Sequence, residues 1–152
     1  MTCYPDTSFL CALYREQDNS KTADAHRKAM TEILPVTSLV LFEFRQSVRF
    51  QTWLHGKDAG KGYGEREGAK MLADLQSDLD AGLVKIIPAD WAKVHSRAEQ
   101  LSAQHTGKTG RRAFDILHVA TALELEAKQF LSFDGGQRAL AKAAGLKVKP
   151  GI

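Results

Sequence analysis

The sequence predicts an α/β fold, a three-layer α/β/α sandwich in which helices cover both faces of a mainly parallel central sheet. Short apolar runs alternate with longer amphipathic segments along the whole chain. Strands that alternate with helices pair in parallel, because a parallel pair needs a crossover connection that a helix supplies. The length fits one domain with an ordinary hydrophobic core, spanning residues 1–152.

The N-terminal half is expected to begin with a strand and to contain three helices. Ser20 is the expected N-cap of the second helix, and Ala25, Ala29 and Ile33 are expected on its inner face. The expected elements are a strand over residues 2–5, helices over 7–16 and 20–33, a strand over 34–37, and a helix over 38–54 capped by Thr37 or Ser38.

The C-terminal half begins after a glycine-rich break over residues 56–64. Asp90 is the expected N-cap of the second helix beyond this break. The expected elements are helices over 65–81 and 90–105, a helix that begins near 112 and one over 136–144, with strands over 83–87, 129–133 and 146–148. A polar loop is expected over residues 106–111.

The composition limits the class of protein. Hydrophobic residues make up 43% and charged residues 26%, which excludes a disordered chain. No apolar run is long enough to span a bilayer, and the N-terminus lacks the pattern of a signal peptide, so we expect a cytoplasmic protein without a membrane partner.

Cys3 and Cys11 lack the spacing of a zinc site and are expected to be buried thiols. The net charge of +3 permits contact with a polyanion without implying it.

Two acidic residues interrupt apolar segments. Glu43 lies within the run Leu-Val-Leu-Phe-Glu-Phe, which is expected to be buried all round, and burial of an unpaired carboxylate costs several kcal/mol. An ion pair with Arg45 or Arg49 is the alternative explanation. Asp115 begins an otherwise apolar helix, with Val119 and Ala122 on the same face as small residues that would let a ligand approach. The alternative there is an acid that complements the helix dipole.

Two further acids each follow an apolar strand and precede a helix. They are Asp6 and Asp134, and either is explained by N-capping alone. The carboxyl ends of parallel strands are also where ligands bind in open α/β sheets. If Asp6, Glu43, Asp115 and Asp134 converge, they suit Mg²⁺ or Mn²⁺, which prefer carboxylate oxygens and assist the hydrolysis of phosphodiesters. The residues alone therefore predict a metal-dependent phosphoryl or phosphodiester hydrolase.

The four acidic stretches, in this order and over nearly the whole chain, resemble the PIN-domain family. Within it they resemble the VapC-type toxin ribonucleases of type II toxin–antitoxin pairs. The resemblance rests on Asp6-Thr7-Ser8, on Glu43 in its apolar helix, on Asp115 in Phe-Asp-Ile-Leu-His-Val-Ala-Thr-Ala, and on Asp134 in Leu-Ser-Phe-Asp. Two departures are Pro5 before the first acid and the Gly-Gly-Gln segment after the last, which predicts a weaker fourth ligand.

The resemblance implies a PIN-like sandwich whose four acids hold Mg²⁺ or Mn²⁺ and cleave RNA. It also implies a homodimer and inhibition by an antitoxin protein. Thr7 or Ser8 would position a water molecule or a phosphate oxygen. Two other readings remain: a housekeeping RNA-processing nuclease without an antitoxin, and a PIN-like domain that binds RNA or protein without cleavage.

Several further side chains near Asp115 have two alternative roles each. The basic residues are Lys108, Arg111 and Arg112, which either contact RNA phosphates or form a solvated loop. His118 is read as a hydrogen-bonded structural residue, with a proton shuttle or an RNA contact as the alternative.

Overall fold

The computed structural model describes residues 1–151, which form an alternating series of strands and helices. The strands are β1 (Cys3–Pro5), β2 (Leu34–Val36), β3 (Val84–Ile86), β4 (Gln129–Leu131) and β5 (Lys147–Lys149). The helices are α1 (Thr7–Tyr14), α2 (Ser20–Ala29), α3 (Ser38–Lys57), α4 (Glu65–Asp80), α5 (Trp91–Thr109), α6 (Ala113–Glu124) and α7 (Gly135–Ala143).

All three strand ladders of the described residues are parallel, as the sequence predicts. β4 pairs with β1 on one side and β5 on the other, with Tyr4 opposite Phe130 in the register. β2 pairs with β3, and β2 also lies beside β1 although no ladder is formed between those two within residues 1–151. The carboxyl ends of β1 and β4 therefore lie next to each other at one edge of the sheet.

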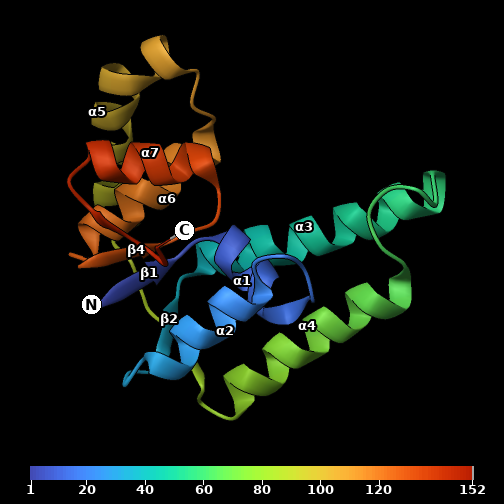
Figure 1. Cartoon of the computed structure of the whole chain (residues 1–152). Coiled ribbons are helices and arrows are strands. Elements are labelled where there is room, and N and C mark those ends of the chain that lie inside the picture. Colours follow the sequence, from blue (N-terminus) through green and yellow to red (C-terminus); the bar gives the residue numbers. More distant parts are fainter. Residues whose placement is uncertain (152) are drawn as a thin grey trace.

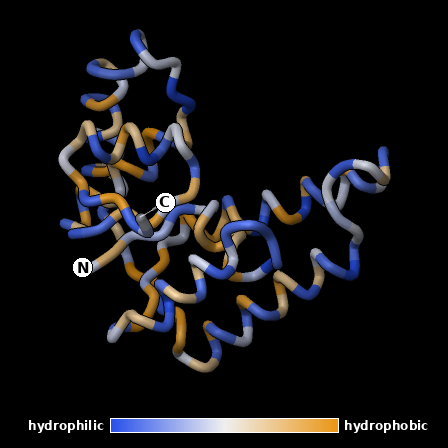
Figure 2. The backbone as a smooth tube through the Cα atoms, in the orientation of Figure 1, coloured by the Kyte–Doolittle hydropathy of each residue, from blue (hydrophilic) through white to orange (hydrophobic). Residues whose placement is uncertain are grey.

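Helices pack in two groups around these strands, which confirms the predicted α/β sandwich (Figure 1). α5, α6 and α7 form one group, in which α6 contacts both of the others. α1 contacts α2 and α3 in the second group, and α3 pairs with α4 to form an arm that extends away from the strands (Figure 1). Hydrophobic and hydrophilic positions alternate along this arm, as expected of helices with one packed face (Figure 2).

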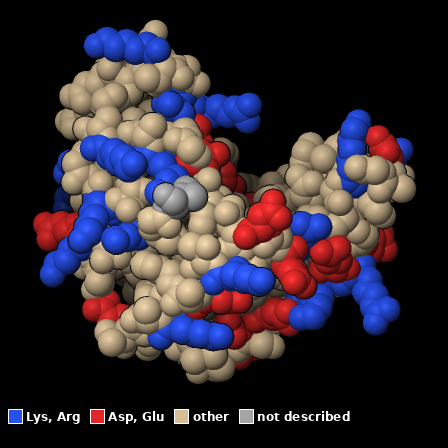
Figure 3. All heavy atoms as spheres, in the orientation of Figure 1, with Lys and Arg blue, Asp and Glu red and all other residues tan. Residues whose placement is uncertain are grey.

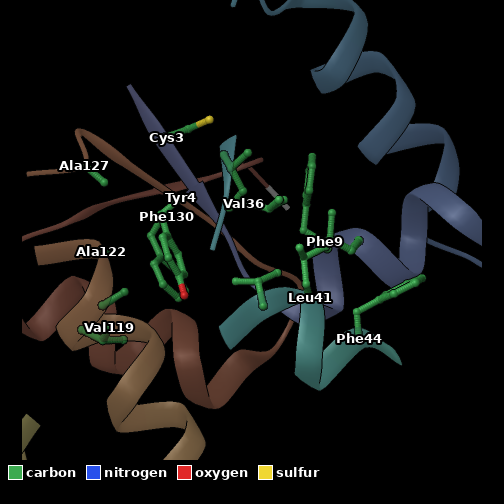
Figure 4. Close-up of a cluster of buried hydrophobic side chains, with 14 of the residues drawn as sticks. Cys3, Tyr4, Phe9, Val36, Leu41, Phe44, Val119, Ala122, Ala127 and Phe130 are labelled. Carbon is green, nitrogen blue, oxygen red and sulfur yellow. The ribbon is translucent and has the colours of Figure 1, made fainter. Parts of the chain in front are cut away.

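The hydrophobic core fills the space between the strands and both helix groups. Tyr4 and Phe130 stack with ring centroids 5.8 Å apart, and both side chains are fully buried. Val119 and Ala122 of α6 lie on one side of this pair, while Leu41 of α3 lies on the other side of the core (Figure 4). Burial of large side chains from β1, β4, α3 and α6 fixes these elements relative to one another.

The helix boundaries agree with the prediction where a capping side chain is present. Thr37 accepts a hydrogen bond from the Val40 backbone N–H at the start of α3, and Asp90 accepts one from the Lys93 N–H at the start of α5. α5 continues to Thr109, where a polar loop was expected, because Gly110 ends it in the left-handed conformation with φ of 62°.

The predicted inner face of α2 is wrong. The helix ends at Ala29, four residues early, and Ala25, Ala29 and Ile33 are all exposed. Its single buried side chain is Ala23, so α2 needs only a narrow contact with α1. Ser20 is the first helical residue rather than the N-cap; its hydroxyl accepts from the Gln17 N–H and donates to a backbone carbonyl upstream.

Within residues 1–151, each helix is too short or too polar to serve as a membrane span.

Candidate active site

Two of the predicted site acids lie at neighbouring strand ends. Asp6 directly follows β1, and its backbone N–H donates to the Leu131 carbonyl at 2.9 Å, which extends the pairing of β1 with β4. Asp134 follows β4 and caps α7 by accepting from the Gln137 N–H at 2.7 Å. Asp6 caps α1 in the same way, through the Phe9 N–H at 3.0 Å. Capping and placement at the sheet edge therefore occur together.

The hydroxyl of Ser8 joins these two strand ends. It donates to Asp6 Oδ1 at 2.6 Å and accepts from the backbone N–H groups of Phe133 at 2.8 Å and Asp134 at 3.2 Å. The predicted contact of Ser8 with water or phosphate stays a prediction, and in this arrangement the hydroxyl is already engaged with protein groups.

Asp6 is fully buried, and one of its oxygens has no protein partner. Oδ1 carries the bonds from Ser8 and Phe9, whereas Oδ2 is buried without a hydrogen bond among residues 1–151. Burial raises the pKa of Asp6, and the hydrogen bonds from Ser8 and Phe9 offset this effect only in part. A buried carboxylate oxygen without a donor is where a cation would compensate the lost hydration.

Glu43 reaches the same region from α3. Its Oε2 accepts hydrogen bonds from the Thr7 hydroxyl and from His118 Nε2, the latter at 2.6 Å. Burial raises the pKa of Glu43, but the hydrogen bonds from His118 and Thr7 outweigh it and leave the pKa below its usual range. The side chain is 26% exposed, so one part of the carboxylate faces the solvent.

Two expectations about Glu43 are wrong in detail. Its segment is not buried all round, because Phe42 is 55% exposed. Among the residues described, neither Arg45 nor Arg49 forms an ion pair with it; Arg45 instead donates to Gln76. The carboxylate is stabilised by His118 of α6, which is 75 residues away in the chain.

Asp115 lies in the first turn of α6, one turn before His118. Its Oδ2 accepts from the Arg112 backbone N–H at 3.3 Å. The carboxylate therefore stabilises the start of the helix, as the alternative explanation by the helix dipole predicts. Val119 and Ala122 are fully buried in the core and leave no open face beside the carboxylate, contrary to expectation. Any ligand of Asp115 therefore approaches from the N-terminal end of α6.

One predicted basic residue lies against the start of α7. A Cβ atom placed on Gly136 would come within 2.3 Å of Arg111 Nη1 and 3.1 Å of Asp134 Oδ1, so the guanidinium occupies the space that a side chain would need. Arg111 Nε is buried and has no hydrogen-bond partner in the described part of the chain. Lys108 and Arg112 are exposed nearby in sequence, at the end of α5 and before α6.

The acids do not form a closed metal cage. No three His, Cys, Asp or Glu side chains of residues 1–151 lie close enough together to hold a metal ion. The donor set nevertheless fits Mg²⁺ or Mn²⁺, because these hard cations retain several waters and bind through one or two carboxylates plus substrate phosphates. Asp6 and Glu43 each offer an oxygen that no described residue occupies. Figure 3 shows acidic side chains gathered in the notch between the two helix groups.

Tyr4 also belongs to this site, although nothing in the sequence predicts it. Its hydroxyl contacts His118 Nδ1 at 2.9 Å, inside the core. The only signal in the sequence is a polar atom on a strand residue two positions before Asp6, and that signal is weak because a buried tyrosine needs a partner in any protein.

A parallel α/β fold with carboxylates at adjacent strand ends defines a class of proteins whose ligands bind at that edge of the sheet. Comparison with known families identifies the class more closely. The model of the PIN domain family matches residues 3–143, so this chain belongs to the PIN domain family. No curated protein sequence matches the chain.

Solved structures with the same fold include VapC20 from Mycobacterium tuberculosis, a toxin that cleaves the sarcin–ricin loop. It is 20% identical, with a TM-score of 0.65 over 98% of this chain and 100% of that chain. FitAcB from Neisseria gonorrhoeae is 17% identical, with a TM-score of 0.61 over 98% of this chain and 97% of that one. VapBC2 from Rickettsia felis, bound to a promoter DNA fragment, is 15% identical, with a TM-score of 0.65 over 98% of each chain.

Proposed function

We propose that this protein is a Mg²⁺- or Mn²⁺-dependent endoribonuclease that cleaves RNA phosphodiester bonds and acts as the toxin of a toxin–antitoxin pair. The observation that carries the nuclease proposal is the buried, unpaired Oδ2 of Asp6 at the carboxyl edge of the sheet. An anionic oxygen kept there at a cost in stability indicates a site selected for a ligand, and a cation is the ligand that its charge favours.

The four acids have unequal parts in this proposal. Asp6 and Glu43 hold the cation directly, since each has one oxygen fixed by protein donors and one free. Asp115 and Asp134 complete the metal site through retained waters or when substrate binds, because no three acidic side chains of residues 1–151 lie close enough together to hold the ion directly. When bound, the cation supplies an activated water and stabilises the charge of the leaving oxygen.

The remaining predicted residues act on the substrate. Arg111 places its guanidinium at the start of α7 beside Asp134, and a guanidinium binds phosphate oxygens well. Lys108 and Arg112 add exposed positive charge at the end of α5 and directly before α6. Thr7 fixes Glu43 through its hydroxyl and is adjacent to Asp6, where it contacts a water or a phosphate oxygen when substrate is present.

The toxin role is supported by the structural neighbours. One of them is a toxin that cleaves the sarcin–ricin loop, and another is a VapBC complex bound to promoter DNA. By analogy we infer an antitoxin protein partner, a homodimer and a cytoplasmic location for this chain. A housekeeping RNA-processing nuclease is the second candidate; it shares the site and lacks the antitoxin. A PIN-like domain that binds without cleavage is the third, and it has no use for the costly burial of Asp6.

The nuclease proposal is tested with the variants Asp6→Asn and Glu43→Gln. Both are expected to lower cleavage of a labelled RNA in Mg²⁺ or Mn²⁺ by at least about 100-fold, since each removes a charged ligand of the cation. Asp24→Asn, on an exposed position of α2, is the matched control and should cleave at the wild-type rate. Cleavage by both site variants at the rate of the control would remove this site from the chemistry.

A separate experiment distinguishes toxin from housekeeping nuclease. Induced expression of the wild-type chain in a bacterial host is expected to arrest growth, and the Asp6→Asn variant is expected to be harmless at the same protein level. Normal growth with active wild-type protein at high expression would favour the housekeeping role.

A further inference from the structure

A chain of two hydrogen-bond contacts runs from the buried side of the sheet to the partly exposed carboxylate of Glu43. The Tyr4 hydroxyl of β1 lies 2.9 Å from His118 Nδ1 of α6, and His118 Nε2 lies 2.6 Å from Glu43 Oε2 of α3. The side chains of Tyr4 and His118 are fully buried. Three elements that are far apart in the sequence therefore meet through these two contacts.

The direction of the hydrogen bond to Glu43 follows from the carboxylate, which accepts. Burial raises the pKa of Tyr4, so its hydroxyl stays protonated and is available as a donor. Glu43 Oε2 already accepts from the Thr7 hydroxyl, as an ionised carboxylate oxygen does. His118 consequently donates its Nε2–H to Glu43, while its Nδ1 contacts the Tyr4 hydroxyl. Tyr4 thus helps to fix the orientation of the imidazole ring from the side opposite Glu43.

The contacts leave the two oxygens of Glu43 in different states. Both donors, Thr7 and His118, bond to Oε2, whereas Oε1 accepts no hydrogen bond from residues 1–151. Asp6 shows the same division, with Oδ1 bonded and Oδ2 free. Each of the two carboxylates is therefore held by one oxygen and offers the other.

We propose that Tyr4 and His118 are positioning residues, which fix the Glu43 carboxylate so that Oε1 faces the cation of the proposed nuclease site. His118 has no exposed surface, so it touches neither the RNA nor the cation and acts only through Glu43. The inference rests on the proposed function for the identity of the ligand. Loss of an outer hydrogen-bonding partner of a metal ligand lowers metal affinity by about 10–100-fold in other proteins.

Two substitutions at His118 separate positioning from simple packing. The amide nitrogen of Gln lies near the place of Nε2, whereas that of Asn lies near the place of Nδ1, so only His118→Gln keeps a donor toward Glu43. We expect His118→Asn to bind Mn²⁺ 10–100-fold more weakly than wild type by calorimetry without RNA. His118→Gln should stay within about threefold of wild type, and Tyr4→Phe should fall between the two variants. His105→Asn, on α5, is the matched control and should bind as wild type does.

A second measurement needs neither metal nor activity. In metal-free wild-type protein, the ¹⁵N chemical shifts of His118 are expected to show a hydrogen-bonded proton on Nε2. In folded Tyr4→Phe, the shift of Nδ1 is expected to change, because this nitrogen loses its contact with the hydroxyl. This measurement and Tyr4→Phe keep the proposal testable if the His118 variants do not fold.

The outcomes distinguish this inference from the proposed function. Equal Mn²⁺ affinity of wild type and folded His118→Asn, or an Nε2 without a proton in wild type, would overturn the positioning role while RNA cleavage could still be present. Mn²⁺ binding that depends on His118, without any RNA cleavage, would support the positioning role and overturn the nuclease. No Mn²⁺ binding by wild type would overturn both.

Discussion

Ser8 Oγ donates to Asp6 Oδ1 at 2.6 Å, and the same oxygen accepts two backbone N–H groups that follow β4. One hydroxyl thus holds the buried acid of one strand end against the backbone of the next. Hydrogen bonds to ionised or buried groups contribute more than ordinary ones, because a lost partner leaves the other group without solvation.

Ser8→Ala is therefore expected to reduce the free energy of unfolding by roughly 1–3 kcal/mol. It removes the donor to Asp6 and leaves the Phe133 N–H without its acceptor. Urea denaturation at neutral pH measures the change. Ser96→Ala, on an exposed position of α5, serves as the control and should change stability by no more than about 0.5 kcal/mol. Equal stability of the two variants would mean that the Ser8 link contributes nothing.

The buried carboxyl of Asp6 predicts a specific pH dependence of stability. Burial raises its pKa in the folded protein, so the folded state favours the protonated form. Its contribution is fully present below the ordinary carboxyl pKa of about 4 and is lost as the pH rises through the raised pKa of the folded state. Asp6→Asn has no such titration. In EDTA, we expect this variant to gain stability relative to wild type as the pH rises above about 4.

The measurement for Asp6 is a series of urea denaturations of both proteins in EDTA, followed by the same series in Mn²⁺. Saturating Mn²⁺ should stabilise the wild type at neutral pH and leave Asp6→Asn nearly unchanged, because only the charged oxygen binds the cation. A stability difference that stays constant over the whole pH range would contradict the raised pKa.

Local features of the sequence predict much of the fold. Thr37 and Asp90 identify helix starts because the capping bond joins residues three apart, and the parallel sheet follows from the alternation of strands and helices. The inner face of α2 is not predictable in this way. A helix with one small buried residue, Ala23, carries too little apolar periodicity to show which side packs.

The candidate site was predictable as residue types and not as contacts. Glu43 stands out because a carboxylate interrupts an apolar run, although the partner that stabilises it is His118 rather than an arginine nearby in sequence. The bonds of His118 to Glu43 and Tyr4 span 75 and 114 residues. No periodicity or spacing encodes such pairs; they form only when β1, α3 and α6 come together in the folded protein.

Asp115 offers a test that separates helix capping from chemistry. Its carboxylate accepts from the Arg112 N–H, and Asp115→Asn keeps an acceptor oxygen there while it removes the charge. We expect the free energy of unfolding to fall by at most about 1 kcal/mol, the usual size of a charge–dipole contribution at a helix start. Cleavage of RNA in Mg²⁺ is expected to fall by at least about 10-fold. Wild-type cleavage by this variant would leave Asp115 with the capping role alone.

Gly136 allows a test of whether Arg111 contacts the substrate, because the neighbouring Gly135 offers a matched control with open space around it. A Cβ on Gly136 would meet Arg111 Nη1, whereas one on Gly135 meets nothing within 4 Å. Gly136→Ala should therefore displace the guanidinium without loss of helix α7, since alanine favours a helix more than glycine does. Gly135→Ala is the matched control and should leave Arg111 in place.

In an Asp6→Asn background that prevents cleavage, we expect Gly136→Ala and Arg111→Ala to weaken binding of single-stranded RNA to a similar extent. Each should reduce the slope of log K against log salt by about 0.7, the value for one lost phosphate contact on a single strand. The double variant should bind no more weakly than either single variant, because both remove the same contact. Fluorescence anisotropy over a range of salt concentrations measures these slopes. If Arg111→Ala has the same salt slope as Gly135→Ala, Arg111 does not contact phosphate. If Gly136→Ala has that slope while Arg111→Ala has a smaller one, the guanidinium reaches the RNA from another position.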